Sequence, residues 1–99
     1  MSAEQIYDLL MTLFGNPPEH PRNGFDPESD AAWIYVDGAL VMLGYVRPGY
    51  WWAHVGGSGQ VSGESAVWVL RRARDLFVED LRGTMLDDLA NRMETWRIG

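Results

Sequence analysis

The first hydrophobic positions of the chain recur every three or four residues, which is the spacing of one face of a helix. These positions are Ile6, Leu9, Leu10, Leu13 and Phe14. Ser2 is followed three residues later by Gln5, which is a capping-box pattern for the start of a helix. Gly15 can adopt the left-handed conformation that often ends a helix. The pattern therefore predicts a helix over residues 3–14.

From residue 32 the hydrophobic residues form three nearly continuous runs that are separated by turn dipeptides. The runs cover residues 32–36, 39–47 and 50–55. Asp37-Gly38 suits the type I′ turn of a β-hairpin, and Pro48-Gly49 suits a type II turn. The three runs are therefore expected to form a three-stranded antiparallel meander.

Registering the meander on these two turns divides its side chains between two faces. One face is expected to carry Trp33, Tyr35, Leu40, Met42, Val46, Trp51 and Val55. The other face is expected to carry Ile34, Val36, Val41, Leu43, Tyr45, Trp52 and His54. Both faces are apolar, whereas a half-exposed antiparallel sheet alternates apolar and polar residues. Two arrangements follow: helices cover both faces of the sheet, or one face is kept for a partner.

Proline, glycine and helical periodicity complete the predicted order of elements. Four prolines predict a proline-rich loop over residues 15–31, because proline removes backbone donors. Residues 56–63 are expected to form a glycine-rich loop, and helices are expected to follow over residues 65–82 and 85–97. The prediction is a single α+β domain over residues 1–99, with the order α-β-β-β-α-α.

Composition narrows the classes of function. The chain has 14 acidic and 8 basic residues, a formal net charge of −6 and no cysteine. All of the basic residues are arginine, which excludes lysine Schiff-base and P-loop chemistry. The negative charge argues against direct binding of nucleic acid, because phosphate contacts need a basic surface. No apolar run approaches the roughly 18 residues of a membrane helix, and the N-terminus lacks the basic start of a signal peptide. We therefore expect a cytoplasmic protein with no membrane partner.

Few residues have the spacing that catalysis or metal binding requires. His20 lies in the proline-rich loop and His54 in the last predicted strand, and neither has a partner at metal-ligand spacing. Ser58, His54 and Asp37 could form a Ser-His-Asp arrangement only if the fold brought them together. The sequence therefore predicts no metal site, no cofactor and no catalytic residue.

The segment from Gln60 to Ser65 reads Q-V-S-G-E-S. It resembles the Q/R-x-x-G-x-G/A motif of the GNAT acyltransferase family, with Ser65 in place of the final small residue. The predicted strands before it are similar to that family's antiparallel strands, so the resemblance extends over residues 32–82. It implies acetyl-CoA as a cofactor, with Gln60, Gly63 and Ser65 at its pyrophosphate, while no residue matches the family's general base or acid. A minimal acyl-CoA-binding protein or acetyltransferase is therefore the alternative function.

Aromatic residues are concentrated in the predicted sheet. Tryptophan and tyrosine dominate the binding hot spots of protein interfaces, and they also fill small cores. The candidate partner-binding residues are Trp33, Tyr35, Tyr50, Trp51 and Trp52. Trp51 and Trp52 are adjacent, so they point to opposite faces of a strand and lie in different layers.

Together, the aromatic sheet and the lack of catalytic motifs predict a non-catalytic protein-interaction module. Its partner is expected to be another protein or further copies of this chain. Two settings fit: a small phage or mobile-element protein that binds and inhibits a host protein, or an oligomeric accessory subunit.

Overall fold

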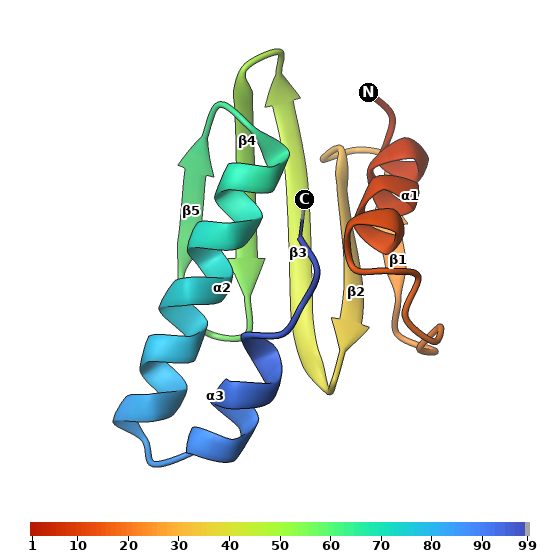
Figure 1. Ribbon diagram of the computed structural model, residues 1–99. Helices are drawn as coiled ribbons and strands as arrows, with labels where there is room; N and C mark the ends of the chain where they lie inside the picture. The colour runs from red at the N-terminus through yellow and green to blue at the C-terminus, as the bar shows by residue number, and fades with distance from the viewer. Residues whose placement is uncertain (99) are drawn as a thin grey trace.

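A five-stranded antiparallel sheet lies behind three helices in the computed structural model, which describes residues 1–98 (Figure 1). The elements are α1 (Ala3–Leu13), β1 (Gly24–Asp26), β2 (Ala31–Val36), β3 (Ala39–Arg47), β4 (Tyr50–Val55), β5 (Gln60–Gly63), α2 (Ala66–Gly83) and α3 (Asp87–Met93). The strands lie side by side in the order β1-β2-β3-β4-β5. All three described helices lie on the same side of the sheet: α1 contacts β1, β2 and β3, α2 contacts β4 and β5, and α3 packs on α2.

The predicted three-stranded meander with the order α-β-β-β-α-α is wrong. The structure has five strands in one sheet, with a further strand on each side of the central three. β1 lies in the segment expected to be a proline-rich loop, and β5 lies in the expected glycine-rich loop. Both strands are short, and each contains a glycine, which has low strand propensity. Pairing with β2 stabilises β1, and pairing with β4 stabilises β5. This contribution comes from residues distant in the sequence, so the local sequence does not predict it.

A β-bulge in the second hairpin changes the predicted register. Arg47 pairs with Tyr50, but Tyr45 pairs with Trp51, so Val46 is an extra residue in β3. A shift of one residue moves every later side chain of the paired strand to the opposite face. Trp51 therefore lies on the helix-covered face, and Trp52 lies on the other face, which reverses the predicted assignment.

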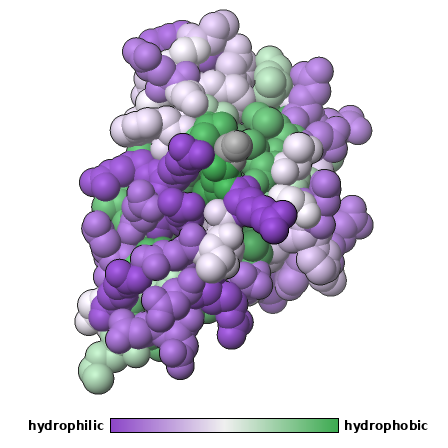
Figure 2. All heavy atoms as spheres, viewed as in Figure 1, coloured by the Kyte–Doolittle hydropathy of each residue, from purple (hydrophilic) through white to green (hydrophobic). Residues whose placement is uncertain are grey.

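The hydrophobic core lies between the sheet and the helices. From the sheet it contains Ala32, Ile34, Val36, Ala39, Val41, Leu43, Ala53, Val55 and Val61. α1 contributes Ile6 and Leu10, and α2 contributes Val69, Leu70 and Ala73, all fully buried. Seen from the helix side, the outer surfaces of α2 and α3 are mainly hydrophilic, and an apolar band is visible between α1 and α2 (Figure 2).

Local signals set the starts of the two longer helices. Ser2 Oγ accepts a hydrogen bond from the Gln5 backbone N–H at 3.3 Å, and the Ser2 N–H donates to Gln5 Oε1 at 2.9 Å. This reciprocal pair satisfies two backbone donors that the first turn leaves free. Ser65 caps α2 in a similar way, because its Oγ accepts from the Trp68 N–H at 3.3 Å.

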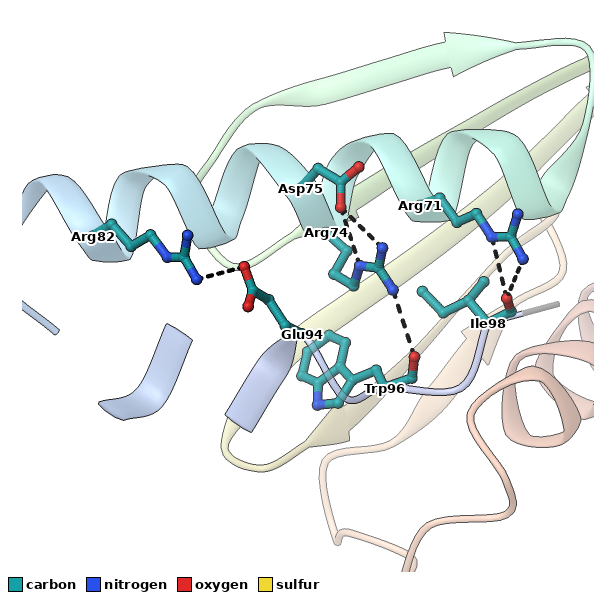
Figure 3. A network of polar contacts seen from close by, with 7 residues as sticks. All are labelled: Arg71, Arg74, Asp75, Arg82, Glu94, Trp96 and Ile98. Carbon is teal, nitrogen blue, oxygen red and sulfur yellow. Dashed lines mark hydrogen bonds and ion pairs between the residues drawn. The ribbon is translucent and has the colours of Figure 1, made fainter. Parts of the chain in front are cut away.

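The segment after α3 is held against the helix layer by polar contacts (Figure 3). Arg71 donates two hydrogen bonds to the Ile98 carbonyl, at 2.7 and 3.2 Å. Arg82 and Glu94 form an ion pair at 2.6 Å. Trp96, which is 8% exposed, donates from Nε1 to Asp37 Oδ2 at 3.1 Å. These contacts connect residues 94–98 to α2 and to the β2–β3 turn.

Gly56, directly after β4, has a backbone conformation that a larger residue cannot adopt without strain. Its φ is +60°, and an added Cβ would lie 2.3 Å from Phe77 Cε2. We expect Gly56→Ala to lower the free energy of unfolding by about 1–3 kcal/mol, measured by chemical denaturation. Gly57→Ala is the control, because a Cβ there meets nothing within 4 Å and should change stability by less than about 0.5 kcal/mol. Equal losses of stability in Gly56→Ala and Gly57→Ala would contradict the strained conformation described for Gly56.

Candidate interaction surface on the sheet

The face of the sheet opposite the helices, called the open face below, is apolar and aromatic. From the strand register it carries Ala31, Trp33, Tyr35, Leu40, Met42, Gly44, Trp52, His54, Gln60 and Ser62 on β2 to β5. None of the ten is acidic, lysine or arginine. The large side chains among them are half-buried, with no described helix over them. Charged residues occur only at its margins, with Asp26 on β1 and Arg47 beside the Pro48-Gly49 turn.

Two tryptophans of the open face sit directly over glycines of neighbouring strands. A Cβ built on Gly44 of β3 would lie 1.9 Å from Trp52 Cε2 and 2.0 Å from its Nε1. A Cβ on Gly24 of β1 would lie 3.0 Å from Trp33 Cζ2. Covering a strand glycine with a cross-strand aromatic compensates for the missing side chain. The glycines therefore let both indole rings lie close to the sheet.

The proline-rich segment bounds the open face along the β1 edge. Arg22 accepts a hydrogen bond at its carbonyl from Trp33 Nε1 at 2.8 Å. Asn23 Oδ1 accepts from the Tyr35 backbone N–H at 2.8 Å, beyond the last pair of β1 with β2. The His20 ring stacks on Tyr35, with ring centroids 4.6 Å apart. These contacts hold the loop beside Trp33 and Tyr35.

The structure brings together three of the five aromatic residues predicted to bind a partner. Trp33, Tyr35 and Trp52 share the open face, each half-buried. Tyr50 lies at the second turn, 40% exposed, with the Arg47 guanidinium 5.0 Å from its ring centroid.

The fifth candidate, Trp51, lies on the helix side, where its ring packs edge-on against Tyr45 at 4.9 Å. Leu40 and Met42 complete the open face and were not among the candidates. Their alternation with Val41 and Leu43 is the signal that places them there.

The residues implied by the acyltransferase resemblance lie at the other edge of the sheet. Gln60 and Gly63 belong to β5, and Ser65 is the N-cap of α2. A cavity of about 350 Å³ beside them is lined by Ser62, Gly63, Glu64, Ser65 and Trp68. Gln60 is not among its lining residues, and Glu64 would face any phosphate group placed there. The segment that the resemblance makes a phosphate-binding loop is a strand here.

The titratable residues considered for catalysis are separated by the sheet. His54 lies on the open face between Met42 and Gln60 of the neighbouring strands. Asp37 accepts a hydrogen bond from Trp96, which packs in the core on the helix side. Ser58, His54 and Asp37 therefore do not form a triad. Within residues 1–98, no group of three or more His, Cys, Asp or Glu side chains could hold a metal ion.

Two further observations concern membrane-spanning helices and similarity to other proteins. None of the helices in residues 1–98 has the length and hydrophobicity needed to cross a membrane. No family model, curated protein or solved structure matches the chain. The fold and surface define a two-layer α+β protein with an open aromatic sheet face, and its function is argued from that geometry.

Proposed function

We propose that the protein is a non-catalytic protein-interaction module that associates with a second copy of itself through the open face. One observation carries this proposal: every described helix covers the same face of the sheet, so Trp33, Met42 and Trp52 lie on a surface without a helix. Contiguous apolar surface of this kind marks an interaction site on soluble proteins. Two sheets that pack face to face bury such side chains between them.

The distribution of charge favours a second copy as the occupant. The chain carries a net charge of −6, so two copies repel unless the acidic residues stay apart. α1, α2 and α3 carry many of the acids, on the side away from the open face. At the margins of the open face, Asp26 and Arg47 have opposite signs, so a two-fold arrangement could bring unlike charges together.

The size of the open face sets the expected affinity. Five strands of three to nine residues, spaced about 4.8 Å apart with a rise of about 3.4 Å per residue, cover roughly 450 Å² on each copy. Two copies would then bury about 900 Å², which is in the range of weak, transient complexes. We therefore expect a dimer that dissociates on dilution through the micromolar range.

Met42 and Met85 provide a matched pair for testing this association. Met42 lies at the centre of the open face, whereas Met85 follows α2 and is 89% exposed. Met42→Arg is expected to weaken dimerisation by about tenfold or more, because it buries an unpaired charge in the interface. Met85→Arg should dimerise like the unmodified protein. Sedimentation equilibrium over a range of concentrations measures both constants.

The outcomes of this test separate association from folding. Both variants should keep a thermal midpoint close to that of the unmodified protein, because neither methionine is fully buried. A protein that stays monomeric to submillimolar concentration would contradict association with a second copy. Inhibition of a host protein, the other setting predicted from the sequence, would then be examined with the same Met42→Arg variant as the control.

The alternative function, binding of acyl-CoA, would use the cavity of about 350 Å³ at the start of α2. Calorimetry with acetyl-CoA tests it directly. We expect no binding at micromolar concentration, because Glu64 lines the cavity and repels a pyrophosphate. Micromolar binding that is lost in Gly63→Val, where a Cβ would lie 2.7 Å from Trp68 Cε3, would support the acyltransferase-like alternative instead.

A further inference from the structure

β5 is one edge of the sheet, and no described strand pairs with its outer side. It pairs only with β4, and its four residues, Gln60 to Gly63, include no charge and no proline. Sheet edges usually carry charged residues, proline or a covering segment, because their free backbone groups can pair with another strand. The opposite edge, β1, contains the charged residue Asp26 and is followed by Pro27. Backbone pairing is therefore available at β5.

An apolar cavity lies beside this edge. Its lining residues come from the end of β5, the N-cap of α2 and Trp68, and its volume is about 350 Å³. Trp68 is 54% exposed although it lies in a helix that packs on the sheet. One side of its ring rests on Gly63, because a Cβ there would lie 2.7 Å from Trp68 Cε3. The exposed part of the ring can therefore contact a side chain that enters the cavity.

The charge at the cavity selects among possible occupants. Glu64 is the only charged residue among those that line it, and no described residue forms an ion pair with Glu64. An anion would be repelled there, whereas an arginine or lysine would be attracted. The occupant that fits is an extended segment with an apolar side chain beside a basic one.

We infer that the β5 edge and this cavity bind an extended peptide segment of a partner protein as a sixth strand. The peptide pairs its backbone with β5, places one apolar side chain against Trp68 and directs an adjacent arginine or lysine toward Glu64. Main-chain pairing supplies affinity in this mode of recognition, and the side-chain pocket supplies specificity. This site is separate from the open face and does not rest on the proposed dimer.

Selection from a displayed library of short random peptides on the purified protein tests the inference. The expected result is a consensus in which an apolar residue neighbours arginine or lysine. A synthetic peptide with that consensus should bind Trp68→Ala at least about tenfold more weakly, since a tryptophan anchor of this kind contributes a binding hot spot. Glu64→Arg should also weaken binding, whereas Glu79→Arg, an exposed acid later in α2, should have little effect.

Backbone methylation distinguishes strand addition from side-chain binding alone. Only alternate amides of an added strand face β5, so methylating one alternate set should abolish binding and methylating the other should preserve it. Failure to enrich peptides, equal binding to Trp68→Ala, or equal effects of the two methylation patterns would each overturn the inference. Met42→Arg should bind the peptide normally, which separates this test from that of the open face. Self-association that is lost in Trp68→Ala would show that a second copy, not a foreign peptide, occupies the edge.

Discussion

Replacing Trp96 with alanine is expected to lower the free energy of unfolding by about 3–5 kcal/mol, the largest stability effect we predict for this chain. Trp96 is 8% exposed, and its ring packs edge-on against Phe14 with centroids 5.3 Å apart. Its Nε1 also donates to Asp37, so the substitution removes a hydrogen bond and opens a cavity between α1 and the segment after α3. Chemical denaturation measures the loss.

Trp68→Ala is the matched control for this prediction. The same side chain is removed, but Trp68 is 54% exposed, so the loss of stability should be below about 1 kcal/mol. If Trp96→Ala and Trp68→Ala destabilise the protein equally, the segment after α3 does not pack as described. The comparison therefore tests whether the segment of residues 94–98 belongs to the core.

Gly44→Ala is expected to displace Trp52 and to reduce association through the open face by about tenfold or more. The new Cβ would occupy the position of the indole ring, 1.9 Å from Trp52 Cε2. Displacing the ring should also lower the free energy of unfolding by about 1–3 kcal/mol, as overpacking does. Sedimentation equilibrium and chemical denaturation measure the two effects.

A double-mutant cycle identifies the cause of the stability loss in Gly44→Ala. In the Trp52→Ala background the ring is absent, so Gly44→Ala should change stability by less than about 0.5 kcal/mol. If the losses of stability are additive in the double variant, the alanine at position 44 disturbs β3 itself. The cycle thus separates displacement of Trp52 from damage to β3.

The local features of this fold can be predicted from the sequence better than the features that depend on tertiary contacts. Ser2 and Gln5 form the capping box that their spacing suggests, because such a pair acts within one turn. The turn at Asp37-Gly38 joins β2 to β3, with positive φ at both residues, as a type I′ turn requires. These elements depend on neighbouring residues and can be predicted from them.

The missing strands and the bulge depend on contacts between distant residues. β1 and β5 have weak local signals and form because β2 and β4 present unpaired edges to them. The extra residue Val46 has no distinctive local pattern, yet it determines which tryptophan of the Trp51-Trp52 pair reaches the open face. The aromatic candidates could therefore be chosen from the sequence, whereas their division between core and surface required the structure.

Paramagnetic relaxation of the tryptophan indole signals, recorded at rising protein concentration with a soluble paramagnetic agent, tests the central claim most directly. The five tryptophans report on different parts of the molecule: Trp33 and Trp52 on the open face, Trp51 and Trp96 on the helix side of the sheet, and Trp68 beside β5. If the open face is the contact surface, the agent should lose access to Trp52 as the dimer forms, while Trp68 stays accessible. Unchanged access to Trp52 in a sample that has dimerised would show that the copies meet elsewhere and would contradict the account.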